Sequence, residues 1–272
     1  MGNGEPPSTE TTAAAVVQEL FARTVCGVDS SEASIEAVRQ AVRLGPAGNE
    51  LLLVAVSESH LAVHAGMQAP KVTAEIEADA RQALDAASEV AVGAQTRLVQ
   101  GRAAETLLRV VTEESSTLVC IGSHDHRRTP GIFLGSVTTL MLHSAPCSVL
   151  VARPPAGEFP RAILAGVDGS AESLRAAAVA GALGQRLDVR PTFLVATGGR
   201  SNEIDAAALA GSGLDLDYSD AHPVAALVEM AQDADLVVLG SRGLRGLRAL
   251  GSVSERVAHR ADCSLLVVRG PG

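Results

Sequence analysis

The feature that most constrains this chain is an internal repeat. Near their starts the two copies read VCGVDSSEAS, at residues 25–34, and AGVDGSAES, at residues 165–173. Further on they read LVCIGSH, at residues 118–124, and LVVLGSR, at residues 236–242. Two separate motifs that recur in the same order indicate that one structural unit has been built twice.

The two copies also end alike. Residues 135–153 and 251–269 both run from a Gly-Ser-Val, through a Cys-Ser, to a final arginine. A chain of 272 residues is long enough for two ordinary domains. We therefore predict one domain over 22–153 and a second over 161–270, joined by the Pro/Gly-rich linker 154–160.

Within each copy, short apolar runs alternate with alanine-rich stretches that have helical character. The last two apolar runs of each copy are continuous, which is typical of parallel strands covered on both faces. An α/β fold class follows, with two doubly wound, five-stranded open parallel sheets of the Rossmann-like type in tandem. Residues 1–21 precede the first copy, and we expect a flexible N-terminal tail there.

Composition excludes several kinds of partner. The net charge is −9, aromatic residues make up 2% of the chain, and tryptophan is absent, so we expect no nucleic acid polymer. The longest apolar runs, such as Leu51–Val56, are far too short to cross a bilayer, so we expect no membrane partner. The first residues lack a secretory signal pattern. These features predict a soluble, cytoplasmic protein.

Several kinds of chemistry are also disfavoured. The one lysine, Lys71, lies outside any glycine-rich turn, which argues against a P-loop and against a pyridoxal enzyme. The cysteines form no CxxC pair and lie in or beside apolar runs, so we interpret them as buried thiols in a reducing cytoplasm. No nucleophile elbow, HEXXH or paired-carboxylate signature occurs. The sequence favours a binding site over a reaction centre.

The polar residues after the strands predict where that site lies. In an open parallel sheet, ligands bind beyond the carboxyl ends of the strands, near the point where the strand order reverses. Asp29 and Asp168 follow the first strands, and the Gly-Ser pairs at 135–136 and 251–252 start the fourth helices. Free N–H groups at such a helix start suit a phosphate group.

These motifs resemble those of ATP-binding universal stress proteins. Such proteins carry Gly, two residues, Gly, nine residues, Gly and then Ser or Thr, with an Asp at the end of strand one. The first copy keeps this spacing but has Asp125 in place of the second glycine. The second copy keeps all three glycines over a shorter loop of seven residues. Because its glycines are intact, the second copy is the stronger candidate.

The resemblance implies an adenine nucleotide alpha hydrolase-like fold and ATP as the ligand, with or without Mg²⁺. Carried over position by position, it gives a set of nucleotide-contacting residues in each copy. In the first copy these are Asp29, Val56, Gly122, His124, Gly135, Ser136, Val137 and Thr138. In the second they are Asp168, Thr197, Gly240, Arg242, Gly243, Gly251, Ser252, Val253 and Ser254. The HxH at 124–126 is typical of a solvated loop, so we predict no metal site.

The same residues also have plainer interpretations. Asp29 and Asp168 could be helix N-caps, and the glycines could serve only tight turns and helix packing. The predicted function is an ATP-binding regulatory protein with little or no catalysis. The alternative is a protein-interaction module that kept the fold and lost the ligand.

A third possibility is an adenylyltransferase of the wider nucleotide-binding α/β group, which the absence of a HIGH-type signature disfavours. Single-domain relatives pair through their last strands. The resemblance therefore implies intramolecular pairing of Ser148–Ala152 with Leu265–Arg269, and it leaves homodimer formation open.

Overall fold

The structure, a computed structural model, describes residues 9–58, 69–123, 134–155, 157–198, 204–241 and 253–270. Helix α1 (Thr9–Leu20) precedes two halves of the same design. The first half contains β1 (Arg23–Val28), α2 (Glu32–Leu44), β2 (Glu50–Ser57), α4 (Ala69–Val90), β3 (Gln95–Gln100), α5 (Ala103–Glu113), β4 (Leu118–Gly122), α6 (Ser136–Ser144) and β5 (Ser148–Ala152).

The second half repeats this order, and its α8 is much shorter than α4. It contains β6 (Ile163–Gly166), α7 (Ala171–Leu187), β7 (Thr192–Ala196), α8 (Ala206–Gly211), β8 (Leu216–Ser219), α9 (Pro223–Met230), the 3₁₀ turn η2 (Ala231–Asp233), β9 (Leu236–Ser241), α10 (Val253–Ala258) and β10 (Ser264–Arg269). The predicted alternation of strands and helices is confirmed in both halves.

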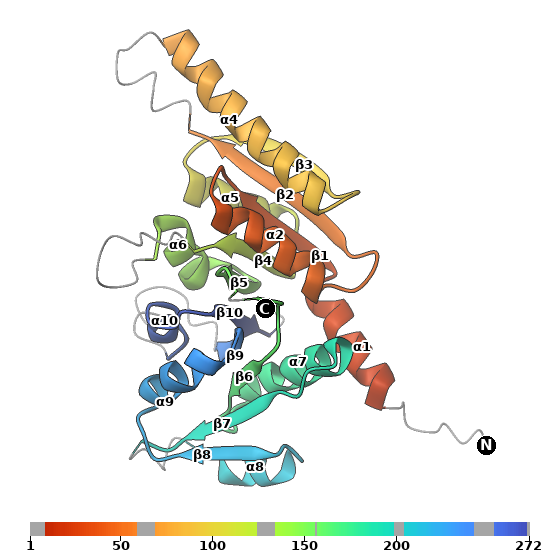
Figure 1. Cartoon of the computed structure of the whole chain (residues 1–272), viewed down its shortest axis with the longest axis vertical. Coiled ribbons are helices and arrows are strands. Elements are labelled where there is room, and N and C mark those ends of the chain that lie inside the picture. The colour runs from red at the N-terminus through yellow and green to blue at the C-terminus, as the bar shows by residue number, and fades with distance from the viewer. Residues whose placement is uncertain are drawn as a thin grey trace, which may run out of the picture.

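In the part of the chain that the structure describes, ten strands form one sheet in the order β3-β2-β1-β4-β5-β10-β9-β6-β7-β8. Each half has its own parallel, five-stranded sheet, and the two join where β5 and β10 pair antiparallel. Leu265 lies opposite Val151, and Val267 lies opposite Val149. The predicted pairing of the two last strands is therefore present, and it places one half above the other in Figure 1.

Helices cover both faces of the sheet. On one face, α1, α2, α4 and α7 share a single apolar core that continues across both halves. On the other face, α5 and α6 cover the first half, and α9 and α10 cover the second. None of the described helices is long and apolar enough to cross a membrane.

The N-terminal segment corrects the predicted flexible tail over 1–21. From Thr9 onward it is helix α1, which contacts α7 of the second half. Val17, Leu20 and Phe21 are 1%, 8% and 0% exposed and belong to the shared core. Their spacing of three and four residues places them on one helix face, and burial of that face holds the segment in place. The N-terminal helix thus bridges the two halves (Figure 1).

Two arginines, one from the end of each half, cross the boundary between the halves. Arg153 follows β5, and its side chain, only 6% exposed, donates to the carbonyl oxygens of Ala258 and Cys263 over 2.6 and 2.9 Å. Arg269 at the end of β10 donates in the same way to the carbonyls of Leu142 and Ala145. Each arginine thereby reaches the C-terminal end of the other half's fourth helix, where a cation is favoured.

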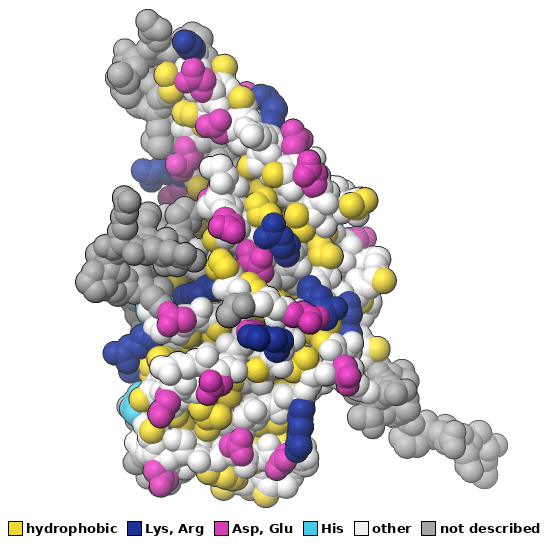
Figure 2. Space-filling view, viewed as in Figure 1, with side chains coloured by type: hydrophobic (Ala, Val, Ile, Leu, Met, Phe, Trp, Pro, Cys, Tyr) yellow, Lys and Arg dark blue, Asp and Glu magenta, His cyan; other side chains and the backbone are white. Residues whose placement is uncertain are grey.

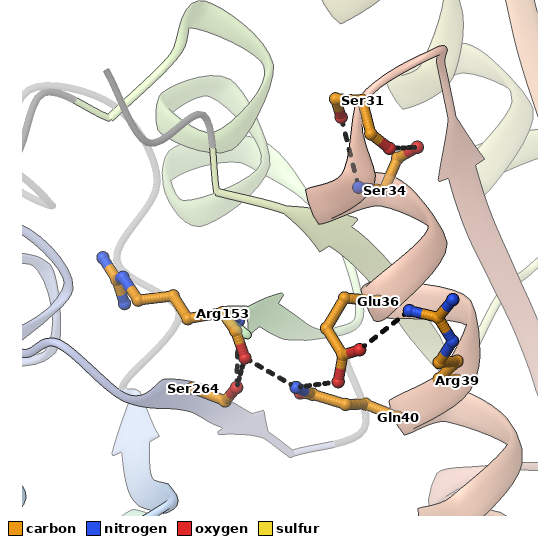
Figure 3. A network of polar contacts seen from close by, with 7 residues as sticks. All are labelled: Ser31, Ser34, Glu36, Arg39, Gln40, Arg153 and Ser264. Atoms are coloured by element: carbon orange, nitrogen blue, oxygen red, sulfur yellow. Dashed lines mark hydrogen bonds and ion pairs between the residues drawn. The ribbon is translucent and has the colours of Figure 1, made fainter. Parts of the chain in front are cut away.

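Backbone and side-chain contacts extend this boundary. The carbonyl of Arg153 accepts hydrogen bonds from the Gln40 amide, at 2.9 Å, and from the Ser264 hydroxyl, at 3.2 Å (Figure 3). Gln40 also donates to Glu36, so α2 is tied to the junction of the two sheets. A second contact joins His143 Nε2 to Glu255 Oε1 at 3.1 Å, with both side chains largely buried.

Candidate functional site

In each half, the first and the fourth strand lie side by side at the switch point, where the strand order reverses. β1 pairs with β2 on one side and with β4 on the other, and β6 does the same with β7 and β9. The helices that follow the first and the fourth strand lie on opposite faces of the sheet. A crevice therefore opens at the carboxyl ends of these two strands. A cavity of about 280 Å³ lies there in the first half, and one of about 160 Å³ lies there in the second.

The polar edge of the first-half cavity is a network around the start of α2. Ser31 donates from its backbone N–H to Asp29 Oδ1 at 2.9 Å, and its hydroxyl donates to the same oxygen. The Ser31 hydroxyl in turn accepts from the N–H of Ser34 and is the N-cap of α2. The interpretation of Asp29 as the N-cap is therefore wrong, because Asp29 instead orients the serine that caps the helix.

The second half repeats this network. The backbone N–H of Ser170 donates to Asp168 Oδ1 at 3.0 Å, and its hydroxyl donates to that oxygen at 2.6 Å. The Ser170 hydroxyl caps α7 by accepting from Ser173 N–H at 3.3 Å. All three residues line the second-half cavity, just as Asp29 and its two serines line the first. The cap interpretation of Asp168 fails for the same reason.

The glycines near the carboxyl ends of β4 and β9 are required by close packing. A Cβ at Gly122 would lie 2.4 Å from the carbonyl carbon of Ala33, and one at Gly240 would lie 2.4 Å from that of Glu172. Such distances are far inside van der Waals contact, so only glycine lets the strand end approach the first turn of the neighbouring helix. Packing therefore requires glycine at both positions, and both glycines also line the cavities.

The start of α6 forms another wall of the first-half cavity. Gly135 is the N-cap residue, and Ser136, Val137 and Thr138 form the first turn. All four line the cavity, and the Thr138 hydroxyl donates to the carbonyl of Gly122 at 3.5 Å. The first N–H groups of a helix have no acceptor within it, so this wall presents backbone donors. In the second half, Val253 and Ser254 of α10 occupy the matching place.

The strand-two positions need one correction. Val56 lines the first-half cavity as expected, together with Val54. The strand pairing aligns Val54 with Gly27 and Leu194 with Gly166, so the second-half counterpart of Val56 is Ala196. Ala196 lines the cavity, whereas the hydroxyl of Thr197 donates to Asp220 at 3.2 Å and to the Ser219 carbonyl. Thr197 therefore lies one residue past the end of β7 and past the position that lines the cavity.

Some predicted residues lie outside the part of the chain that the structure describes. These are His124, Arg242, Gly243, Gly251 and Ser252. The structure brings together the remaining members of each predicted set, apart from Thr197.

Other wall residues were not predicted. His222, the N-cap of α9, and Arg256 of α10 line the second-half cavity. The His-Pro pair at 222–223 was a visible signal, because proline is frequent in the first turn of a helix and marks the preceding residue as the cap. Nothing in the sequence pattern showed that this cap would face the site.

The cysteines contribute no nucleophile to either cavity. All four are unpaired and buried. Burial raises the pKa of Cys147 to about 12 and that of Cys263 to about 11, and it also raises the pKa of Cys120 well above the usual thiol value. Thiols that stay protonated at neutral pH are poor nucleophiles, and none of them lines the two cavities described above.

Fold and site together define a Rossmann-like α/β protein with a polar cavity at the switch point of each half. The family model described as "Universal stress protein family" matches residues 21–153 and 200–269. The chain therefore belongs to the universal stress protein family, in a tandem form. The matched positions cover more than half of the sequence.

Similar proteins agree with this assignment. Universal stress protein Rv2623 from Mycobacterium tuberculosis is 28% identical over 291 positions, which cover 90% of this chain and 95% of that protein. A universal stress protein from Mycolicibacterium smegmatis is 29% identical, with coverages of 89% and 95%. A crystal structure of a universal stress protein from Archaeoglobus fulgidus has the same fold, with a TM-score of 0.66 at 18% identity over 93% of this chain and 99% of that one.

Proposed function

We propose that this universal stress protein binds ATP and acts as a nucleotide-responsive regulatory protein with little or no catalysis. The observation that carries the proposal is that one polar constellation occurs twice. In both halves an Asp–Ser–Ser network, a strand-end glycine and the start of the fourth helix surround a cavity at the switch point. Some members of the family bind nucleotides.

The walls suit the parts of a nucleotide. Val54, Val56, Leu107 and Ile121 give the first-half cavity an apolar side that fits a purine base. The opposite side, at the start of α6, offers backbone N–H groups and the positive end of the helix dipole to phosphates. Ribose hydroxyls fit beside Asp29, whose carboxylate is held by Ser31.

Cavity size refines this assignment. Ligand pockets usually measure roughly 300–1,000 Å³, and the two cavities, at about 280 and 160 Å³, lie at and below the small end of that range. The described walls therefore fit the base and sugar, with phosphates toward the helix starts. The larger volume favours the first half, whereas the intact glycine motif favours the second.

Mg²⁺ would enter with the phosphates. Among the described residues, no group of three or more His, Cys, Asp or Glu side chains is placed to hold a metal ion. Mg²⁺ is commonly held by substrate phosphates and water with one or two carboxylates, and Asp29 and Asp168 are the carboxylates that line both cavities in matching places.

Isothermal titration with ATP tests the proposal. We expect saturable binding in the intact chain, and at least a roughly tenfold loss at one site in Val56→Trp and at the other in Ala196→Trp, because the new indole fills the apolar side of each cavity. Val42→Trp is the matched control, since Val42 is 44% exposed on α2 and lines neither cavity.

A thermal shift experiment separates this function from the alternative. A ligand at a hundredfold excess over its dissociation constant stabilises the folded chain by about 2.7 kcal/mol. Absence of any shift with ATP and Mg²⁺, together with flat titrations, would favour the module that binds a protein partner without nucleotide.

Cellular context follows from the same chemistry. We place the protein in the cytoplasm, which four unpaired buried cysteines favour. The face in Figure 2 carries acidic side chains dispersed among basic ones, with no continuous basic area, in keeping with a small-molecule ligand rather than a nucleic acid. The proposal includes a regulatory protein partner, and it leaves homodimer formation open.

A further inference from the structure

The second-half cavity contains a side chain that the first half lacks. His222 lines this cavity and is the N-cap residue of α9. It is followed by Pro223, which has no backbone N–H and restrains the preceding residue to an extended backbone. His222 has that conformation, with φ −60° and ψ 136°.

One nitrogen of the imidazole is engaged by the backbone of α9. The backbone N–H of Val224 donates to His222 Nδ1 at 3.3 Å. On the other side, the loop after β7 packs against the His222 backbone, since a Cβ at Gly198 would lie 2.8 Å from the His222 Cα. Because Nδ1 accepts a hydrogen bond, the neutral ring carries its proton on Nε2, which is therefore a donor.

The side of the cavity formed by β7, β9 and α9 is largely apolar and suits a purine base. On the side of β7, β9 and α9, the cavity is lined by Leu194, Ala196, Leu227 and Leu239, whereas Asp168 and its serines lie at the start of α7. A ring donor beside these apolar side chains would orient a ligand by its acceptors, whereas Arg256 lines the cavity from α10. Purine rings present ring nitrogens as such acceptors.

The first half has no counterpart. The N-cap of α5 is Arg102, which makes no side-chain capping bond and is paired with Glu105 at 3.5 Å on the surface. The N–H of Ala103 is instead capped by Glu58 Oε1 at 2.8 Å. Ala103 lines the first-half cavity, so at this place the wall offers a methyl group.

We propose that His222 is a base-reading residue of the second-half cavity, donating from Nε2–H to a ring nitrogen of the bound purine. This inference rests on the nucleotide binding proposed above. It makes the two halves unequal, because only the second distinguishes purines by that acceptor.

Titrations with deaza analogues test it. In a chain carrying Val56→Trp to block the first-half cavity, 1-deaza-, 3-deaza- and 7-deaza-ATP are compared with ATP at about pH 8, above the usual imidazole range. Each analogue lacks a different ring nitrogen. We expect the one that lacks the nitrogen bound by His222 to bind about 2- to 10-fold more weakly than ATP. In His222→Ser this penalty disappears, because serine keeps the helix cap but cannot reach the base.

The matched control is Arg102→Ser, at the equivalent cap of the first half, measured in a chain carrying Ala196→Trp. It should leave every analogue-to-ATP ratio unchanged. Equal melting midpoints of His222→Ser and the unsubstituted chain without nucleotide confirm that the fold is retained.

Two results overturn the inference. Equal binding of ATP and all three analogues to the unsubstituted second-half cavity shows that no ring nitrogen is read. An analogue penalty that persists in His222→Ser assigns the reading to another group. Both leave nucleotide binding itself intact, whereas the absence of saturable ATP binding removes the proposed function and this inference together.

Discussion

At the scale of single residues, the strand-end glycines show how a motif position can have a packing cause. Gly122 and Gly240 belong to the motif that resembles nucleotide-binding relatives, yet each is required by the backbone of the helix beside it. A glycine at this position is therefore necessary for the fold with or without a ligand. The residues that discriminate between the two functions are side chains that line a cavity without such a packing requirement, such as Val56 and Ala196.

This packing requirement predicts the effect of a single methyl group. In Gly122→Ala the new Cβ would meet the backbone at Ala33 at 2.4 Å, so β4 and α2 must move apart. We expect a loss of about 1–3 kcal/mol in the free energy of unfolding, measured by urea denaturation.

Gly181→Ala is the matched control. Gly181 lies within α7, and nothing lies within 4 Å of a Cβ placed there. Because alanine restricts the unfolded chain and favours the helix, we expect a gain of about 0.5–1 kcal/mol. A Gly122→Ala chain as stable as the unsubstituted one would show that the strand end does not require glycine.

At the scale of secondary structure elements, the sequence predicted the core strands and missed the N-terminal helix. Continuous apolar runs and the repeat fixed the strands, because a strand buried on both faces leaves a clear compositional pattern. Helix α1 has no such compositional pattern, because its Thr/Ala-rich start resembles a linker. Its packing partner, α7, belongs to the second half and is distant in the sequence. The shift between Thr197 and Ala196 has a similar origin, since register is set by pairing with the neighbouring strand.

The helix α1 has a testable energetic role. Phe21, directly after it, is fully buried in the core shared by the two halves. Phe21→Ala should destabilise the chain by about 3–5 kcal/mol, because it removes a large apolar side chain and leaves a cavity.

Val42→Ala is the control for Phe21→Ala, since Val42 is 44% exposed and we expect a change within about 0.5 kcal/mol. Equal unfolding midpoints for the two variants in urea would mean that the N-terminal segment is dispensable.

At the scale of the whole molecule, the repeat predicted two similar sheets and the resemblance implied that their last strands would pair, which the structure bears out. The crossing arginines could not be predicted in the same way. Arg153 and Arg269 were visible as the last residues of the two copies, but their partners are backbone carbonyls of the opposite half, which no sequence pattern marks. The boundary therefore depends on polar contacts as well as on strand pairing.

Replacing Arg153 measures how strongly this boundary holds the halves together. In Arg153→Met the carbonyls of Ala258 and Cys263 lose their donors in a buried setting, so we expect about 2–4 kcal/mol less stability. Arg109→Met is the control, because its pair with Glu113 is a half-exposed contact one helix turn apart, expected to contribute no more than about 0.5 kcal/mol. If the arginine couples the halves, calorimetry of Arg153→Met should resolve two transitions where the unsubstituted chain has one. A single transition, displaced no further than that of Arg109→Met, would instead show that β5–β10 pairing and helix α1 suffice to make the two halves one cooperative unit.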